Sequence, residues 1–400
     1  MVQKKNLRDI DVSGKRVLLR SDLNVPFTDD GMEIANANRI VESLPTVRYL
    51  VQNNATVVIC SHLGRPKGQR IKDFTLLPVA TKLEEYLMRP VKFIGESSLE
   101  DAKYAVNLLK AGDVLLLENL RFHPGEEKND PEFCKSLSEL ADIYVNDAFG
   151  SSHRAHASIQ GITNYLPSVA GLLLEKEIQF LGLTLSNPSK PFTAILGGGK
   201  ISDKIKVVEK VVEIADDVLI GGGMAATFIK AMGCEVGKSI VEESYIQKAK
   251  DLLAVNSSSF GNLFLPKDVV VADKFSSEAA TRVCAISDIK PYEILMDIGP
   301  STVSLFSSII SKSALILWNG PMGVFEMSSF SSGTKAVATS MVNAQAITII
   351  GGGSTVEAVS SIGLEDNMTH VSTGGGASLE FLEGRELPGV TSLMNSSISK

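Results

Sequence analysis

Short apolar segments recur along the chain, and most of them do not alternate between apolar and polar positions. They lie at 16–20, 56–60, 114–117, 143–146, 193–196, 217–220, 294–298, 315–318 and 347–350. Segments that are apolar on both faces are typical of strands in a parallel sheet covered by helices. Stretches with helical spacing, such as 201–215, separate them. The pattern therefore predicts an α/β fold with doubly wound parallel sheets.

The length of 400 residues is typical of two domains. Residues 166–185 are predicted to form one long helix, with Pro167 near its start and Pro188 and Pro191 after its end. Such a break at mid-chain favours an inter-domain hinge. We predict two Rossmann-like domains, an N-terminal one over 1–165 and a C-terminal one over 186–383, joined by the hinge helix over 166–185.

The predicted strands of the two halves end in different residues. Triple glycines stand at 197–199, 221–223, 351–353 and 374–376 in the second half. In the first half the strands continue into polar, mostly basic segments such as RSDLN (20–24), SHLGR (61–65) and ENLR (118–121). Ligands of open α/β sheets bind outside the carboxyl ends of the strands. We therefore expect one site in each half, built from different chemistry.

The glycine turns of the second half suit a nucleotide. Glycine lets the backbone approach a ligand, and a helix that begins there directs free N–H groups at it. Lys200 and Lys204 would share one face of the first turn of the helix predicted over 201–215. Because two ammonium groups there repel each other, a bound polyphosphate would offset the cost. The alternative is a pair of solvated surface lysines.

Two further glycine motifs point to other chemistry. Residues 221–226 (GGGMAA) fit a loose G-x-G-x-x-A pattern, which suggests a dinucleotide and a nicotinamide-dependent dehydrogenase. One match of this kind does not account for four glycine turns. Residues 233–239 (GCEVGKS) resemble a phosphate-binding loop but are one residue too short, and no clear strand enters them. We interpret them as the loop after a helix.

Cations that suit an anionic ligand gather in the first half. Guanidinium groups bind carboxylates and phosphates in bidentate geometry, although a surface salt bridge is the alternative for any one arginine. Two histidines, His123 and His153, are weaker candidates, with a structural role as the alternative. The stronger candidates follow or neighbour predicted strand ends or lie early in a helical stretch, and they are His62, Arg65, Arg121, Arg154 and Arg39.

Composition narrows the possible classes of protein. The net charge of −7 argues against nucleic-acid binding as the main task. Four well-separated cysteines without a CxxC pair favour reduced thiols and a cytoplasmic location over disulfides or a zinc site. The N-terminus shows no secretory signal, and apolar runs stay below the roughly 18 residues that a membrane-spanning helix needs.

The chain also lacks sequence signatures of metal-dependent or triad hydrolases. A mechanism that uses only cations and backbone amides fits phosphoryl transfer, because catalysis there is mostly positioning and charge stabilisation. A carboxylate acceptor is already ionised at pH 7 and needs no general base. The arginine-rich half therefore favours the formation or use of an acyl phosphate.

Nine longer motifs extend over nearly the whole chain. They are RVLLRSDLNVP (16–26), SHLGRP (61–66), ENLRFHPGEEKND (118–130), NDAFGSSHRAHAS (146–158), ILGGGKISDKI (195–205), IGGGMAATF (220–228), DIGPST (297–302), WNGPMGVFE (318–326) and STGGGASLEFLEGRELPGV (372–390). In this order they resemble the phosphoglycerate kinase family. The resemblance implies the reaction 1,3-bisphosphoglycerate + ADP ⇌ 3-phosphoglycerate + ATP with Mg²⁺, in a cytoplasmic monomer whose two domains close. It also implies that 384–400 returns to the N-terminal domain.

The resemblance implies roles for the acid-binding residues. Asp22 and Asn24 would hold the carboxyl and hydroxyl end of the substrate, and Arg39 would lie at the transferring group. The phosphate at the other end would be bound by His62, Arg65, Arg121 and Arg154.

It implies roles for the nucleotide-binding residues as well. Lys200 and Lys204 would contact the phosphates, Gly222 and Gly223 would pack on adenine, and Glu326 would hold the ribose. Thr373 and the amides of Gly374, Gly375 and Gly376 would stabilise the phosphoryl group during transfer. The nucleotide site would be completed by Asn319, Pro321, Gly352, Gly353, Ser354, Thr355 and Thr373.

One position departs from the pattern of the family. Where the family has GGGDT or GGGDS, this chain has GGGST at 351–355, so Ser354 replaces the aspartate that would contact Mg²⁺. A neutral hydroxyl is a poorer ligand for a hard dication, and Glu357 is a distant substitute. We expect weaker binding of the magnesium nucleotide with the reaction class intact. A non-catalytic nucleotide-binding homologue is the alternative.

Overall fold

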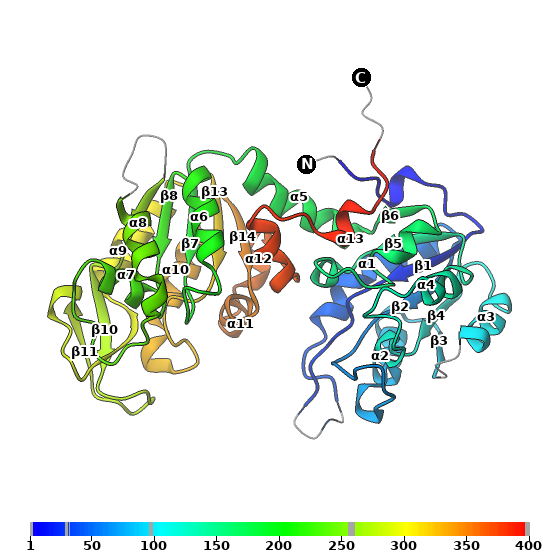
Figure 1. The fold of residues 1–400 in the computed structure, drawn as a ribbon, viewed down its shortest axis with the longest axis horizontal. Coiled ribbons are helices and arrows are strands. Elements are labelled where there is room, and N and C mark those ends of the chain that lie inside the picture. The colour runs from blue at the N-terminus through cyan, green and yellow to red at the C-terminus, as the bar shows by residue number, and fades with distance from the viewer. Residues whose placement is uncertain (1–2, 29–30, 32, 96–98, 255–260, 397–400) are drawn as a thin grey trace. The chain divides into compact units, whose positions relative to one another are not determined.

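The computed structural model describes residues 3–28, 31, 33–95, 99–254 and 261–396 (Figure 1). The chain divides into two compact units. Unit 1 comprises Met1–Gln179 and Glu386–Lys400, and unit 2 comprises Phe180–Arg385. The C-terminal segment thus belongs to the unit that contains the N-terminus, where the amide of Lys5 donates to the carbonyl of Met394 across 2.8 Å.

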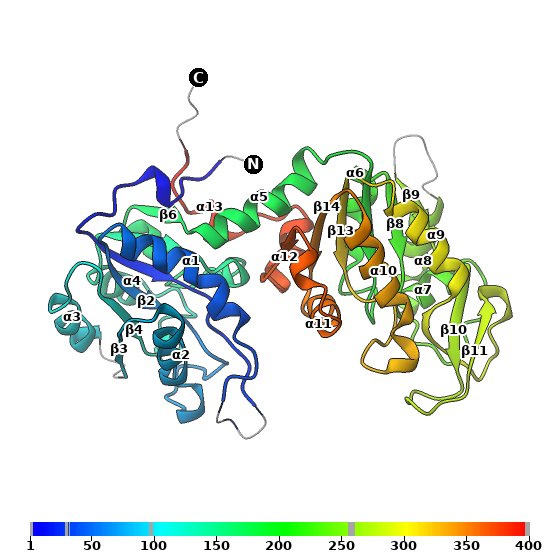
Figure 2. The same cartoon turned by 180° about the vertical axis from the view of Figure 1, so that it is seen from behind.

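A six-stranded sheet forms the centre of unit 1, in the order β3-β4-β2-β1-β5-β6, and every pairing in it is parallel. Helices α1 and α2 pack against each other, as Figure 2 shows. The strands are β1 (Arg16–Arg20), β2 (Thr56–Cys60), β3 (Val91–Ile94), β4 (Val114–Leu117), β5 (Ile143–Asn146) and β6 (Ser168–Ala170). The helices are α1 (Asn38–Gln52), α2 (Leu77–Leu87), α3 (Leu99–Asn107), α4 (Pro131–Ser138) and α13 (Pro388–Thr391).

The prediction of one helix over 166–185 was wrong at its start. Residues Ser168–Ala170 form β6, which pairs with β5, and α5 (Leu172–Ser186) begins only after Gly171. The carbonyl of Pro167 accepts from the amide of Tyr144 across 2.9 Å, so pairing with the sheet edge prevails over the helical pattern. The division between the units, after Gln179, falls within α5.

Unit 2 is also built on a six-stranded parallel sheet, in the order β15-β14-β13-β7-β8-β9. Its strands are β7 (Phe192–Leu196), β8 (Asp217–Ile220), β9 (Asn262–Phe264), β13 (Leu315–Asn319), β14 (Ile347–Gly351) and β15 (His370–Val371). Its helices are α6 (Ile205–Ile214), α7 (Ala225–Ala231), α8 (Ile246–Ala254), α9 (Pro300–Ile310), α10 (Ser332–Asn343), α11 (Gly353–Ser361) and α12 (Gly376–Leu382). The predicted α/β class with two parallel sheets is confirmed.

A second sheet in unit 2 is antiparallel, with the order β11-β10-β12. It consists of β10 (Asp268–Ala272), β11 (Thr281–Ala285) and β12 (Ile294–Ile298). The sequence predicted 294–298 correctly as a strand but wrongly as part of a parallel sheet. An unbroken apolar run does not show the direction of its partner, which here is the distant strand β10.

Burial explains why these segments form strands. Every residue of β2, β4, β7 and β13 is buried, as expected for sheets covered by helices on both faces. Within the described residues, none of the helices is both long and apolar enough to cross a membrane.

Candidate functional site

Four basic side chains, three arginines and one histidine, come from the carboxyl edge of the sheet in unit 1. Arg20 is the last residue of β1, and His62 follows β2 by two residues. Arg121 stands in the short helical turn Leu120–Phe122 after β4, and Arg154 follows β5 by eight residues. Because the strands are parallel, their carboxyl ends meet at one edge. We call these four residues, together with Arg39, the basic cluster.

Arg20 is the buried centre of the basic cluster, and its role was not predicted from the sequence. Its side chain is 1% exposed, and its Nε donates to Oγ of Ser158 across 2.9 Å. The Ser158 hydroxyl donates in turn to Oε1 of the buried Glu126 across 2.6 Å. Arg20 Nη2 lies 3.1 Å from Nδ1 of His62. The available signal was a charged residue at the end of β1, directly after the apolar run at 17–19.

His62 is held in its neutral form. Burial lowers the pKa of His62 well below its usual value; Asp22 opposes this effect, while Arg20, Arg121 and Arg39 add to it. A guanidinium group donates hydrogen bonds but cannot accept them, so Nδ1 of His62 accepts from Arg20. The ring proton is therefore on Nε2, which makes neutral His62 a hydrogen-bond donor.

Asp22 is held in its ionised form by the same surroundings. Its Oδ2 lies 2.5 Å from Nη1 of Arg39, which follows the first residue of α1. Burial alone would raise the pKa of Asp22, but the charges of Arg39 and Arg20, with a hydrogen bond from Arg39, outweigh it and hold the pKa well below its usual range. The neighbouring Asn24 uses its side-chain oxygen to accept from the amide of Gly64 across 2.8 Å. The NH₂ group of Asn24 remains for a ligand.

Arg121 and Arg154 add two more guanidinium groups. Arg121 is buried, donates from Nη1 to the carbonyl of Gly64 across 2.6 Å, and lies 3.1 Å from Oε1 of Glu127. Burial and then Arg154 lower the pKa of Arg121 to about 10. Arg154 is half-buried and lies 3.2 Å from Nε2 of His153. The side chain of Arg65 is exposed.

The basic cluster creates a strongly positive environment. Burial, followed by the charges of Arg121, Arg154 and Arg20, lowers the pKa of His156 to about 4. A bound anion would relieve this mutual repulsion of buried cations. The weaker candidate His123 instead packs on the ring of Phe133, with 4.8 Å between ring centroids, and burial lowers its pKa. This contact matches the structural alternative for His123.

Unit 2 contains a cavity of about 720 Å³ at its glycine turns. This volume is in the range of small-molecule sites. The predicted residues that line it are Gly222, Gly223, Pro321, Glu326 and Ser354. Sequence reasoning missed the apolar wall, which brings together Ile240, Phe275, Leu295, Met296, Val324 and Met327. These residues come from separate loops and strands, and no local pattern connects them.

The two lysines after the first glycine turn have different surroundings. Helix α6 begins at Ile205, so residues 201–204 form turns, and the prediction that both lysines lie in the first helical turn was wrong. Lys200 is exposed. Lys204 Nζ donates to the carbonyls of Gly197 across 2.7 Å and Asn319 across 3.0 Å, and burial lowers the pKa of Lys204 to about 8. One of its three N–H donors remains for a ligand.

The glycines of these turns serve two purposes. Gly222 has a φ of +64°, and a Cβ there would lie 2.5 Å from the amide nitrogen of Gly198. Gly222 therefore lets two turns pack together, which the prediction of ligand contact did not include. By contrast, a Cβ at Gly353, Gly375 or Gly376 would meet no atom within 4 Å. These three positions are open to an approaching ligand.

Ser354 and Thr355 are consecutive residues in the first turn of α11, but their surroundings differ. Ser354 is exposed and lines the cavity. Thr355 is buried, and its hydroxyl accepts from the amide of Gly320 across 2.6 Å, so it supports the turn after β13. Asn319 is also buried, and its Nδ2 has no partner within the described part of the chain. Thr373 is half-buried between β15 and α12.

Acidic metal ligands do not gather near Ser354. No group of three or more His, Cys, Asp or Glu side chains that could hold a metal ion occurs in the part that the structure describes. Ser354 offers one neutral hydroxyl at this edge of the cavity. A magnesium ion there would take most of its ligands from phosphate oxygens and water.

Comparisons with known proteins match nearly the whole chain. A family model described as phosphoglycerate kinase matches residues 7–385. The structure of phosphoglycerate kinase from Coxiella burnetii is similar, with a TM-score of 0.89 and 39% identity over 97% of this chain and 98% of that chain. The crystal structure of phosphoglycerate kinase from Pyrococcus horikoshii OT3 has a TM-score of 0.84 and 34% identity, over 98% of each chain.

Proposed function

The chain belongs to the phosphoglycerate kinase family, and we propose that unit 1 binds the three-carbon acid while unit 2 binds the nucleotide. It is a phosphotransferase whose reaction is the reversible transfer of a phosphoryl group from 1,3-bisphosphoglycerate to ADP. The basic cluster is the observation that supports acid binding by unit 1. Its buried cations favour a multiply charged anion, and a phosphorylated carboxylic acid is one.

In unit 1, each end of the acid has suitable partners. Arg65, Arg121 and Arg154 bind the phosphate at the end that does not react, and neutral His62 donates to it from Nε2. Ionised Asp22 accepts from the substrate hydroxyl, and Asn24 donates from its NH₂ group. Arg39, paired with Asp22, lies at the group that is transferred. This arrangement positions the acid without a general base.

In unit 2, the cavity at the glycine turns binds the nucleotide. Gly222 and Gly223 allow adenine to pack against the backbone, and the apolar wall that includes Leu295 and Val324 covers it. The carboxylate of Glu326 accepts from the ribose hydroxyls. Exposed Lys200 binds the phosphates, while Lys204 fixes the turns through two carbonyls and offers its third N–H.

The transfer itself needs positioning and stabilisation of charge. The nucleophile in the ATP-forming direction is a phosphate oxygen of ADP, and in the reverse direction it is the carboxylate of the acid. Arg39, Lys200, Thr373 and the amides of Gly375 and Gly376 stabilise charge on the phosphoryl group. Because the two substrates bind in different units, we propose that the units close around them, with α5 as the hinge.

Magnesium supplies charge neutralisation on the nucleotide phosphates when it is bound. We propose that Ser354 is a weak contact and that phosphates and water hold most of the ion. Monomeric state and cytoplasmic location complete the proposal, and both rest on the family resemblance. The domain limits 1–165, 166–185, 186–383 and 384–400 stay a prediction.

The test is an assay of 3-phosphoglycerate-dependent formation of ADP from MgATP, run across a magnesium titration. We expect turnover that requires both substrates and saturates at a higher magnesium concentration than for a variant with aspartate at 354. Tight MgADP binding without turnover would instead indicate a non-catalytic homologue. NADH binding at the glycine turns, with no MgADP binding, would indicate a dehydrogenase.

A further inference from the structure

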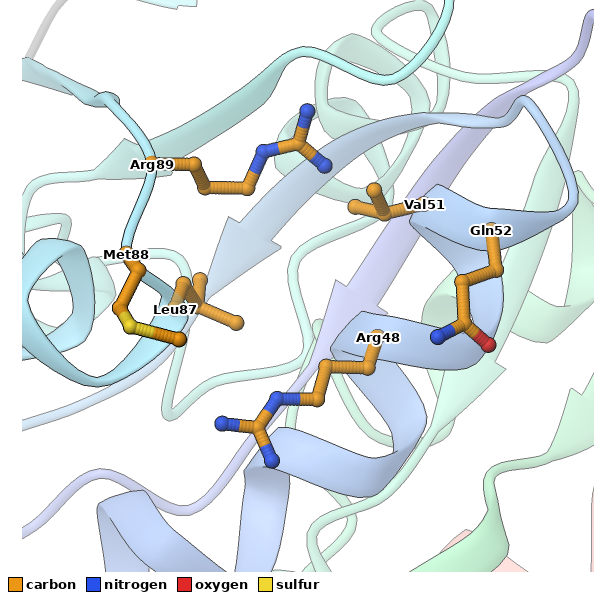
Figure 3. Close-up of a pocket in the computed structure, with 6 residues that line it drawn as sticks. All are labelled: Arg48, Val51, Gln52, Leu87, Met88 and Arg89. Atoms are coloured by element: carbon orange, nitrogen blue, oxygen red, sulfur yellow. The ribbon is translucent and has the colours of Figure 1, made fainter.

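A separate cavity of about 380 Å³ lies in unit 1, between the end of α1 and the turn that connects α2 with β3 (Figure 3). It is lined by Arg48, Val51, Gln52, Leu87, Met88 and Arg89. Helix α1 runs from the carboxyl end of β1 to the amino end of β2, and α2 likewise leads to the amino end of β3. The cavity is therefore at the amino edge of the sheet, opposite the basic cluster.

The lining combines an apolar surface with two guanidinium groups. Val51, Leu87 and Met88 supply the apolar part, and Met88 is 88% exposed. Figure 3 shows Arg48 and Arg89 on opposite sides of this space, with Arg89 reaching from the turn before β3 toward Val51 and Arg48 extending from α1 along the other side. None of the six described residues that line the cavity carries a carboxylate.

The two arginines also lack acidic partners, unlike many others in the chain. Arg48 donates from Nη2 to the carbonyl of Tyr86 across 2.9 Å, which leaves most of its donors for other groups. Among the residues that the structure describes, neither Arg48 nor Arg89 forms an ion pair with a carboxylate. Six other arginines do so, and these are Arg8, Arg16, Arg39, Arg121, Arg282 and Arg385.

We propose that this cavity binds a small anion that carries an apolar portion, either a phosphate monoester or a carboxylate with a short alkyl or aryl chain. Arg48 and Arg89 bind the charged head from two sides, and Val51, Leu87 and Met88 cover the apolar chain. In a chain with a net charge of −7, two unpaired guanidinium groups beside apolar surface select for this combination. The inference does not depend on the catalytic assignment.

The probes are octyl phosphate and octanoate, with octanol and inorganic phosphate as the two half-probes. The full chain is first saturated with 3-phosphoglycerate and ADP, so that the sites described above are occupied. Amide chemical shifts then report where each probe binds. We expect shifts confined to 48–52 and 87–89, and affinities for both half-probes that are at least about tenfold weaker. The proposal would be overturned if octanol bound as tightly as octyl phosphate, or if the probes shifted amide signals outside these residues.

Variants separate charge from folding. Met88 has a φ of +53°, a conformation that aspartate and asparagine tolerate, so Met88→Asp and Met88→Asn should both fold. They differ by one charge at the cavity, and we expect Met88→Asp to bind octyl phosphate at least about fivefold more weakly than Met88→Asn. Arg48→Gln and Arg89→Gln, as single variants, should each also weaken binding, while Arg8→Gln, which removes one positive charge elsewhere in unit 1, should not. Equal affinity in the two Met88 variants would refute a role for charge.

Comparison of the two probes identifies the head group. Octyl phosphate and octanoate share the apolar chain and differ in charge and in the number of acceptor oxygens. Preference for the phosphate by more than about tenfold would assign a phosphate monoester, because each guanidinium fork can then bind its own pair of oxygens. The reverse preference would assign a carboxylate. Failure of both probes to bind would leave the cavity without the proposed ligand and overturn the inference.

Discussion

Arg20 donates a hydrogen bond to Nδ1 of His62 across 3.1 Å, and both side chains are buried beneath the candidate acid site. The bond fixes the tautomer of His62, because the guanidinium group has no acceptor. The charge of Arg20 also disfavours protonation of the ring. His62 can therefore present an N–H to a phosphate at neutral pH in its uncharged form.

Replacement of Arg20 should raise the pKa of His62. In Arg20→Met the nearby positive charge is lost while burial remains, so the pKa moves up toward its usual value without reaching it. NMR titration of the histidine ring protons measures this shift. His123 is the internal control, because burial lowers its pKa and Arg20 has no part in it. Equal shifts of His62 and His123 would show a general loss of structure instead.

Because Arg39 is placed at the transferring group and is paired with Asp22, its removal should lower turnover. Arg39→Ala should lower kcat by about 10²–10³, as the loss of a donor to the transition state does. The matched control is Arg16→Ala, which removes another surface arginine–aspartate pair, with 2.9 Å between Arg16 and Asp142. Steady-state kinetics at saturating substrates compare the two. A near-normal kcat in Arg39→Ala would remove Arg39 from the mechanism.

Much of the fold follows from local pattern. The limits of β1, β2, β4, β5, β8 and β12 agree with the apolar segments in the sequence. The prediction failed where distant partners decide. Residues 168–170 become a strand because they pair with β5, and 294–298 become antiparallel because β10 is the neighbour. Neither partner can be found from the spacing of apolar residues alone.

The candidate site, like the fold, could be predicted only in part. Cations and glycines at strand ends could be predicted, because parallel strands bring their carboxyl ends to one edge. The role of Arg20 could not, since it depends on Ser158 and Glu126, more than a hundred residues away in sequence. The orientation of Lys204 toward two carbonyls also depends on the strand that ends at Asn319.

Lys200 and Lys204 should respond differently to substitution. Lys200→Ala removes an exposed ammonium group, so kcat should fall by about 10²–10³ while stability stays within about 0.5 kcal/mol of the parent. Lys204→Met removes the Nζ donor of the Gly197 carbonyl, while the Asn319 carbonyl keeps only its bond from the amide of Gly197, and this loss should cost about 1–3 kcal/mol. Denaturant unfolding measures the change in stability and steady-state kinetics measures the change in kcat, so the two effects can be separated. Equal destabilisation by both variants would contradict the observed bonds of Lys204.

Ser354 predicts a change in magnesium dependence. Ser354→Asp adds a carboxylate at the cavity, and half-maximal activity should be reached at a lower magnesium concentration. The control is Ser332→Asp, which adds the same charge at the exposed first residue of α10 in the same unit. The measurement is activity against free magnesium at fixed ATP. If Ser354→Asp showed the parent's magnesium dependence, residue 354 would not contact the ion.

Asp297 predicts the pH dependence of stability in unit 2. Its buried carboxyl group accepts from the amides of Ile298 and Gly333, and burial raises its pKa to about 7 in spite of these bonds. Between about pH 4 and 7 the folded chain therefore keeps a proton that the unfolded chain releases, so this group lowers the free energy of unfolding as pH rises. The expected fall between pH 5 and 8 is on the order of 2–3 kcal/mol.

Asp297→Asn stays neutral at every pH, so its unfolding free energy should fall less over this range than that of the parent, even if its value at pH 5 is lower. Asp268 gives the opposite case. Burial would raise its pKa, but bonds from Ser301 and Thr302 outweigh that effect and lower it. Stability from Asp268 is present above about pH 4 and is lost as pH falls. Denaturant titrations should thus show the difference between Asp297→Asn and the parent changing between pH 5 and 8, and the difference between Asp268→Asn and the parent changing only as pH falls below about 4. A change of the Asp268→Asn difference between pH 5 and 8 would refute the assignment.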